Sequence, residues 1–297
     1  MNTAWHKQLI ELLQKDGRRS SQKLAREIGV SHSTVQRTIR KLVGEGRLRI
    51  AAVVDPVRVG FPIEVVALLS VDQSRLDWVM AELVRSPNVN SVSHVAGRFD
   101  ILAFMRFSSF DKLSQFFRQE LANIAGIKNS ETLICLDTRK GRYALLKHTI
   151  LETPYRKLIG LLQDDGRRNS EVLATELKVS PSTVQRTIHK LINDGVLRIS
   201  ALVDADKAGL KVSAVICVDV EQNKWDQVVE GLAKQPAVRY VSKTAGSSDV
   251  LAFTRFRGNA ELTEFLEKVV AKMVGVRNSE TFVVLDFQYG SMYADWT

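Results

Sequence analysis

Two identical heptapeptides, STVQRTI at residues 33–39 and at 182–188, carry polar and basic side chains at helical spacing. Around the first, Val35, Ile39, Leu42 and Val43 predict one inward apolar stripe of a helix. Arginine can donate paired hydrogen bonds to guanine O6 and N7, and glutamine can pair with adenine N6 and N7. We therefore expect the opposite face to enter the major groove of DNA, and this face comprises Ser33, Thr34, Gln36, Arg37, Arg40 and Lys41.

The second heptapeptide predicts the same kind of face. The residues that would line it are Ser182, Thr183, Gln185, Arg186, His189 and Lys190, the last two in place of Arg40 and Lys41. Because the glutamine and arginine that would read bases are unchanged, both helices are predicted to prefer nearly the same half-site. The pattern alone also fits an ordinary solvated helix face, so the flanking elements must decide between the two interpretations.

The elements before each heptapeptide predict a helix-turn-helix. Apolar spacing over residues 5–15 indicates an amphipathic helix that ends at Asp16-Gly17, and residues 20–28 indicate a second, shorter helix. A three-residue turn, Gly29-Val30-Ser31, follows, and the Ser31 hydroxyl is placed to accept from the amide of residue 33 or 34 as a helix N-cap. The basic strand-like run at 47–50 then favours a winged form.

The second copy of these elements differs in small ways. Thr153-Pro154 predicts a capped helix with proline at its first position, and Ser180-Pro181 predicts the same for the third helix. Lys178 stands where the first copy has Gly29, so this turn must form without glycine.

The whole chain is a tandem repeat with a constant offset of 149 residues. DGRRS at 16–20 returns as DGRRN at 165–169, and NSET at 129–132 returns at 278–281. About 23 of 35 residues are identical between 16–50 and 165–199, whereas about 32 of 88 are identical between 51–138 and 200–287. The first third of each copy has therefore diverged least.

The excess positive charge lies in these two less diverged segments and in the join between the copies. The 297 residues carry a net charge of +9 and a pI near 9.6. Residues 1–50 contribute +7, the join at 139–153 contributes +3 and residues 154–199 contribute +3, whereas 51–138 and 200–297 contribute −2 each. A polyanionic partner, double-stranded DNA, is thus expected at the helix-turn-helix segments.

Several classes of protein are not favoured. Cys135 and Cys217 lie singly in apolar runs, which predicts two buried thiols and neither a zinc site nor a disulfide framework. No run of 18 apolar residues is present and the N-terminus is charged, so we expect a cytoplasmic protein that does not contact membranes. Catalytic-triad order, a glycine-rich phosphate loop and metal-ligand spacing are absent from the sequence, so no metal and no cofactor are expected.

The longer segment of each copy predicts a βαββαβ order. In the first copy the strands are expected at 62–71, 89–95, 100–107 and 131–137, and the helices at 76–86 and 110–125. Antiparallel strands with both helices on one face give a ferredoxin-like domain, whose other face is too apolar for water. The fused copy at about 212–286 is the expected partner because its local concentration is high.

Together these motifs resemble the Lrp/AsnC family of bacterial and archaeal transcription regulators. The resemblance rests on L-x-x-D-G-R-R-S, L-A-x-E-I-G-V-S-x-S-T-V-x-R, the L-R-I step into A-x-V-D-P, and A-G-R-F-D-I-L-A-F, over about 5–138 and again over about 155–287. It implies a winged helix-turn-helix, a linker strand and a regulation-of-amino-acid-metabolism module that oligomerises and often binds an amino acid. Most members carry one unit per chain, so this chain resembles a covalent dimer.

The family's G-x-x-D turn, near which effectors lie, corresponds to Gly97–Asp100 and Gly246–Asp249. The resemblance implies that a carboxylate beside this turn accepts from an α-ammonium group, although glycine and aspartate can also simply shape a turn. The intervening residues are Arg98-Phe99 in one copy and Ser247-Ser248 in the other, so any two ligand sites should differ.

We therefore predict an α+β chain with two winged helix-turn-helix domains and two ferredoxin-like domains. Their expected bounds are 1–50, 51–138, a basic linker at 139–153, 154–199 and 200–297. The expected function is a DNA-binding transcription regulator, not an enzyme, that responds to an amino acid or related metabolite and forms a homo-oligomer, a dimer or tetramer of the fused chain.

Two alternatives stay open. Sirohaem decarboxylases share this resemblance, but they use histidines with an aromatic strand where this chain has G-x-x-D, and His94 is matched by Lys243 in the second copy. The other alternative is a ligand-binding scaffold with vestigial DNA modules, which loss of Arg37 or Arg186 would have favoured.

Overall fold

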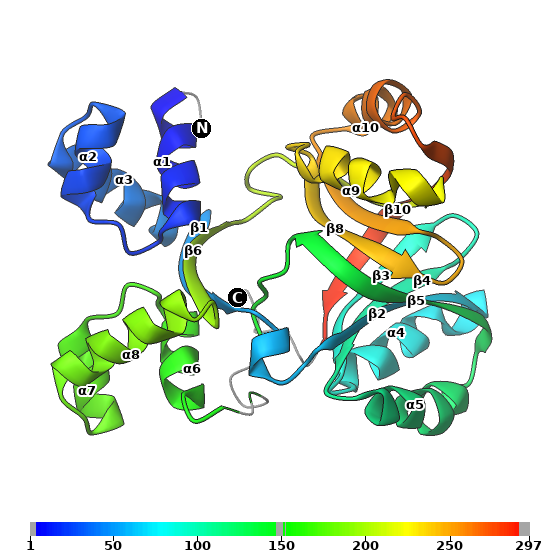
Figure 1. Cartoon of the computed structure of the whole chain (residues 1–297), viewed down its shortest axis with the longest axis horizontal. Coiled ribbons are helices and arrows are strands. Elements are labelled where there is room, and N and C mark those ends of the chain that lie inside the picture. The colour runs from blue at the N-terminus through cyan, green and yellow to red at the C-terminus, as the bar shows by residue number, and fades with distance from the viewer. Residues whose placement is uncertain (1–3, 147–150, 152, 291–297) are drawn as a thin grey trace. The chain divides into compact units, whose positions relative to one another are not determined.

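The computed structural model describes residues 4–146, 151 and 153–290, which form two compact units that each combine segments of both repeats (Figure 1). One unit holds the described residues up to Val59 together with Tyr143–Gly209, and the other holds Gly60–Arg142 and the residues from Leu210 on. The α+β class and the tandem arrangement agree with the sequence. The expected boundaries after residues 50 and 199 fall inside strands, and part of the basic join, including His148, lies outside the described residues.

The first unit contains two three-helix modules, each followed by a strand. The first module comprises α1 (Ala4–Lys15), α2 (Ser21–Ile28), α3 (His32–Gly44) and β1 (Leu48–Val54). The second comprises α6 (Arg156–Asp164), α7 (Ser170–Leu177), α8 (Pro181–Asn193) and β6 (Leu197–Val203). The helix expected from Pro154 begins at Arg156, because the Thr153 hydroxyl accepts from the amide of Tyr155 and holds a turn there.

The two helices expected to enter the major groove, α3 and α8, are called the recognition helices below, and both begin at the predicted serine caps. The amide of Thr34 donates to Ser31 Oγ at 3.1 Å, and the amide of Thr183 donates to Ser180 Oγ at 3.1 Å. Each bond satisfies one of the amides that a helix leaves unpaired at its start. The two caps therefore fix where the helices begin, in the same way in both copies.

The turn before each recognition helix has a left-handed residue in both copies. Gly29 has φ 78° and Lys178 has φ 56°, and Lys178 is the one non-glycine residue with positive φ among those described. The second copy thus keeps the conformation without glycine, and an L side chain in this region costs roughly 1–2 kcal/mol.

The difference between Gly29 and Lys178 predicts that substitutions at the two turns have opposite effects on the free energy of unfolding. Gly29→Ala is expected to destabilise the first unit by about 1–2 kcal/mol, because a Cβ there would meet no atom within 4 Å and only the backbone conformation opposes it. Lys178→Gly is expected to have no destabilising effect, or to stabilise by up to about 1 kcal/mol. Urea denaturation curves of the two variants would test this, and a stabilising alanine at 29 would contradict it.

Strands β1 and β6 pair with each other across the repeats. The pairing is antiparallel, and Ala51 lies opposite Ser200, which is its own counterpart 149 residues later. The ribbon is therefore centred on an approximate twofold axis, with the helices of one module on each side of it (Figure 1). Each module obtains its strand partner from the other copy.

The second unit is a closed eight-stranded barrel in the order β10-β3-β4-β2-β5-β8-β9-β7. The first copy supplies β2 (Ile63–Val71), α4 (Leu76–Arg85), β3 (Val89–Ala96), β4 (Ile101–Phe107), α5 (Phe110–Gln119) and β5 (Ile127–Lys140). The second supplies β7 (Val212–Val220), α9 (Trp225–Ala233), β8 (Val238–Ala245), β9 (Val250–Phe256), α10 (Asn259–Phe265) and β10 (Val276–Tyr289). Each copy has the predicted βαββαβ order.

The barrel covers the apolar sheet faces that the sequence left unpaired. Antiparallel pairs β5–β8 and β10–β3 join the copies at two seams, and the helix pairs α4–α5 and α9–α10 lie outside opposite halves (Figure 1). Buried residues of both copies, such as Leu68, Phe99, Leu133, Leu251 and Phe282, form one cluster. Among the helices of the described part of the chain, none has the length and apolar composition to cross a bilayer.

Candidate nucleic-acid interface and ligand-binding region

The recognition helices expose the side chains expected to read bases. Gln36, Arg37, Gln185 and Arg186 are all exposed, and so are the residues at the next turn, Arg40, Lys41, His189 and Lys190. The buried side of α3 consists of Val35, Ile39 and Leu42, and that of α8 consists of Val184, Ile188 and Leu191. The sequence spacing therefore brings all eight onto two solvent-facing surfaces.

The hydroxyl residues of the same face are engaged at the helix starts. Ser33 and Thr34 bond to Ser31 Oγ at 2.9 and 2.8 Å, and Thr34 is half-buried. Ser182 and Thr183 form the same bonds with Ser180, each at 2.8 Å. The hydroxyl groups of these four residues thus help to order the first turn of each recognition helix, next to the glutamine and arginine that follow in the sequence.

The expectation for Val43 was wrong. This residue was assigned to the inward stripe, but its side chain is 46% exposed. Val43 follows Leu42 by one residue, or 100° of helix, which carries it beyond the face that Leu42 and Ile39 bury. Its counterpart Ile192 is 39% exposed, so both recognition helices end with an apolar side chain in solvent.

The arginines of the two DGRR motifs hold the modules together, a role that the sequence interpretation missed. Arg18 Nη2 donates to the carbonyl of Arg168 at 2.6 Å, and Arg167 donates to the carbonyls of Gly17 and Arg19 at 2.7 and 2.9 Å. Burial lowers the pKa of both guanidinium groups. Arg18 and Arg167 therefore contribute to the interface between the modules.

The glycines of the same motifs allow this close packing. The amide of Gly17 donates to Ile199 O and that of Gly166 to Ile50 O, each at 2.8 Å. A Cβ on Gly17 would lie 2.9 Å from Ile50 Cγ2, and a Cβ on Gly166 would lie 2.8 Å from Ile199 Cγ2. The repetition of D-G-R-R in both copies marks these residues in the sequence, but it does not indicate that they contact the other module.

The second arginine of each motif is also engaged inside its own module. Arg19 Nη1 lies 2.6 Å from Glu27 Oε2, and Arg168 forms the equivalent ion pair with Glu176. All four arginines of the two motifs are therefore engaged within the protein.

The carboxylates of the two G-x-x-D turns accept hydrogen bonds within their own domains. Asp100 accepts from the amide of Val71 at 2.8 Å and from Gln73 Nε2 at 2.6 Å. Asp249 accepts from the amide of Val220 at 2.7 Å and lies 3.5 Å from Arg277 Nη2. An ammonium group of a ligand that bound either carboxylate would share it with the protein donors that already bind it, among them the amide of Val71 on β2 or of Val220 on β7.

The two turns differ in what they contact across the copies. Arg98 Nη1 lies 2.6 Å from Glu131 Oε1, and Arg98 Nη2 lies 3.2 Å from Glu280 Oε2, the counterpart of Glu131 in the second copy. The bond from Arg98 lowers the pKa of Glu131. One guanidinium therefore serves both glutamates, and the second turn has Ser247 in the position of Arg98.

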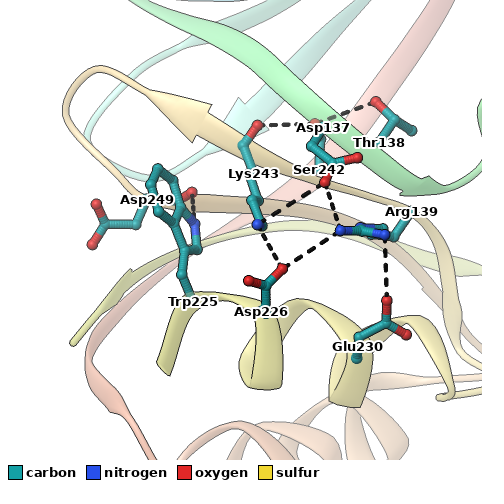
Figure 2. Close-up of polar contacts among 9 residues, drawn as sticks. All are labelled: Asp137, Thr138, Arg139, Trp225, Asp226, Glu230, Ser242, Lys243 and Asp249. Carbon is teal, nitrogen blue, oxygen red and sulfur yellow. Dashed lines mark hydrogen bonds and ion pairs between the residues drawn. The ribbon is translucent and has the colours of Figure 1, made fainter. Parts of the chain in front are cut away.

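A network of ion pairs lies at the β5–β8 seam (Figure 2). Lys243 Nζ lies 2.6 Å from Asp226 on α9, and Arg139 lies 2.8 Å from Asp137 and 3.8 Å from Glu230. At the other seam, His94 replaces Lys243 in register with Asp286, and Gln288 replaces Arg139. His94, which raised the alternative of a sirohaem decarboxylase, therefore corresponds in the second copy to Lys243, which forms an ion pair with Asp226.

The cysteines are unpaired, and their thiols are poor nucleophiles. Cys217 is buried and Cys135 is half-buried, so the expectation of two fully buried residues holds for one of them. Burial raises the pKa of the Cys217 thiol to about 12 and raises that of Cys135 as well. Among the described residues, no group of three or more His, Cys, Asp or Glu could hold a metal ion.

Comparison with known families agrees with this division of the molecule. The profile for the AsnC-type helix-turn-helix domain matches residues 7–43 and 156–192. The profile for the Lrp/AsnC ligand binding domain matches residues 64–145 and 213–289, more than half of the chain. The chain belongs to the Lrp/AsnC family. This Lrp/AsnC chain carries both family domains twice, as the tandem repeat requires.

Relatives match one copy at a time. An HTH-type transcriptional regulator of Pyrococcus abyssi is 36% identical over 130 residues, which cover 43% of this chain and 82% of that protein. The HTH-type transcriptional regulator FL11 of Pyrococcus horikoshii is 30% identical over 131 residues, or 44% of this chain and 86% of that protein. The chain is thus an Lrp/AsnC-type transcriptional regulator, and each of these alignments is about as long as one of its two repeats.

A solved structure matches the fused arrangement as a whole. The sirohaem decarboxylase NirDL superposes with a TM-score of 0.70 over 98% of this chain and 95% of that one, at 17% sequence identity. At this identity the likeness is one of fold alone.

Proposed function

We propose that this Lrp/AsnC chain is a sequence-specific DNA-binding regulator whose two modules bind two half-sites of one operator. The observation that carries the proposal is the identical, solvent-exposed pair of glutamine and arginine on α3 and α8. Both pairs follow a capped helix start, the geometry with which recognition helices meet base edges. Gln36, Arg37, Gln185 and Arg186 read bases, and the exposed Arg40, Lys41, His189 and Lys190 lie toward the phosphates.

The decarboxylase alternative has less support from the residues. The chain keeps G-x-x-D at 97–100 and at 246–249, and Lys243 in the second copy is held by Asp226. The two exposed base-reading pairs also favour DNA over a scaffold with vestigial modules. We therefore propose regulation without catalysis.

An amino acid or a related small metabolite is the proposed effector, bound near the G-x-x-D turns formed by Gly97, Asp100, Gly246 and Asp249. The family's ligand binding domain supports a small-molecule effector, and the resemblance to the family implies that it is an amino acid. Because Arg98 contacts both Glu131 and Glu280 whereas Ser247 stands in its place in the second copy, the two sites would bind with unequal affinity.

We also propose that the fused chain associates with further copies, as a dimer or a tetramer. Leu136 and Leu285 occupy equivalent bulges of β5 and β10 and are 57% and 58% exposed. Burial of such residues against another copy would remove apolar surface from water.

Selection of bound fragments from a random DNA pool, on protein of measured mass and with and without a panel of amino acids, tests these proposals. The expected result is an operator with two related half-sites, and affinity that falls linearly on a log–log plot against salt with a slope of about 0.9 per phosphate contact. A pool that stays random would refute the DNA proposal. Identical enrichment with every amino acid would refute the effector.

A further inference from the structure

The two modules differ in exposed charge although their base-reading residues agree. Residues 21–44 contain five Lys or Arg and one Glu, whereas residues 170–193 contain three Lys or Arg and two Glu. The first helix-turn-helix therefore carries +4 and the second +1, with histidine taken as neutral. This difference in net charge arises from substitutions at specific positions of the two modules.

Three exposed cations of the first module have uncharged counterparts in the second. Lys23 and Arg26 lie on α2 and Arg40 lies on α3, and all three are exposed. Their counterparts, in the same order, are Val172, Thr175 and His189, which are also exposed. The second module gains one cation, Lys178, in its turn and one anion, Glu171, in place of Gln22, so these two changes cancel.

These three cations are available to a partner. Within the described residues, none of Lys23, Arg26 and Arg40 forms an ion pair, whereas Arg18, Arg19, Arg167 and Arg168 are all engaged in the protein. Lys23 and Arg26 are three residues apart on α2 and so share a face. The helix before a recognition helix crosses the DNA backbone, which places this face toward phosphate.

We propose that the first module is the anchor of the protein on DNA and that the second is a weaker reader of the same sequence. This inference rests on the proposed function. Lys23, Arg26 and Arg40 supply the first module with phosphate contacts that Val172, Thr175 and His189 do not replace. On DNA with only one intact half-site, the chain therefore binds through its first module.

Single half-site DNA distinguishes an anchor from two equal modules. The probe is the selected operator with one half-site randomised, and the readout is the affinity of full-length Arg37→Ala and Arg186→Ala chains. Arg37→Ala is expected to weaken binding about 5- to 150-fold, the loss of one base-reading arginine, whereas Arg186→Ala changes it less than twofold. Equal losses in the two variants would overturn the proposal.

Exchange of the three side chains tests the cause. A chain with Lys23→Val, Arg26→Thr, Arg40→His, Val172→Lys, Thr175→Arg and His189→Arg should reverse the pattern, so that Arg186→Ala becomes the damaging change. Lys23→Val, Arg26→Thr and Arg40→His alone should reduce the salt dependence, because each phosphate contact accounts for about a 3- to 4-fold loss of affinity between 50 and 200 mM salt. If the exchange leaves Arg37 dominant, these residues are not the anchor.

The outcomes also separate this inference from the function on which it rests. Failure of the unaltered chain to prefer any sequence would refute the proposed function. Preference for the operator with equal effects of Arg37→Ala and Arg186→Ala would refute the anchor alone. Circular dichroism of each variant confirms that the exposed substitutions leave the fold intact.

Discussion

Arg37→Ala together with Arg186→Ala is expected to reduce the free energy of operator binding by about 2–6 kcal/mol, or about 1–3 kcal/mol per contact. Both arginines are exposed on the recognition helices, and an exposed arginine can donate paired hydrogen bonds to guanine. Their loss removes discrimination between bases as well as affinity. Competition between the operator and random DNA, measured by fluorescence anisotropy, would therefore show a collapsed specificity ratio.

The matched control removes the same charge elsewhere. Arg118 and Arg257 are exposed residues of the barrel unit, one on α5 and one after β9. Arg118→Ala with Arg257→Ala should leave the specificity ratio unchanged. If the double variant at 37 and 186 loses affinity for operator and random DNA equally, the two arginines contact phosphate and not bases.

Phe282→Ala is expected to destabilise the barrel unit by about 3–5 kcal/mol. The Phe282 side chain is fully buried in the barrel interior, its ring centroid lies 6.2 Å from that of Phe99, and its edge packs on Gly97. Alanine would leave a cavity between the two copies. Urea unfolding followed by the fluorescence of Trp78 and Trp225, which lie in this unit, measures the change.

The chain itself provides the control for this substitution. Leu133 is the counterpart of Phe282 and is equally buried, so leucine is the residue that the other half of the barrel uses at this place. Phe282→Leu should cost markedly less than Phe282→Ala, because the side chain still fills most of the volume. Equal destabilisation by alanine and leucine would mean that the aromatic contact with Phe99, and not the volume, stabilises the unit.

Local patterns predicted the features of this protein that depend on local physics. The serine caps at Ser31 and Ser180, the buried stripes of α3 and α8 and the βαββαβ order follow from spacing and hydrogen bonding along short segments. The exact repeat also allowed the apolar sheet faces to be assigned to each other. The prediction that Val43 is buried was wrong because a stripe of four apolar residues covers a wider arc of the helix than the face that a small module buries.

Partners across the repeat could not be predicted in the same way. Arg18 and Arg167 look like DNA-binding cations in the sequence, and only the pairing of β1 with β6 brings backbone carbonyls of the other module to them. The shared contact of Arg98 with Glu131 and Glu280 likewise depends on the closure of the barrel. The candidate effector residues remain a prediction because the carboxylates of Asp100 and Asp249 also have partners within their own domains.

The pairing of Ala51 with Ser200 has a consequence for the way that this protein can vary. In a dimer of identical chains, any substitution at the central pair is made on both sides, so only two alanines or two serines could meet there. Here the pair is mixed, and Ser200 Oγ donates to the carbonyl of Gln14 at 2.9 Å without a matching hydroxyl at residue 51. A substitution in this chain is made once and its energetic cost is counted once, so each half can accept changes that a symmetric dimer would have to tolerate twice.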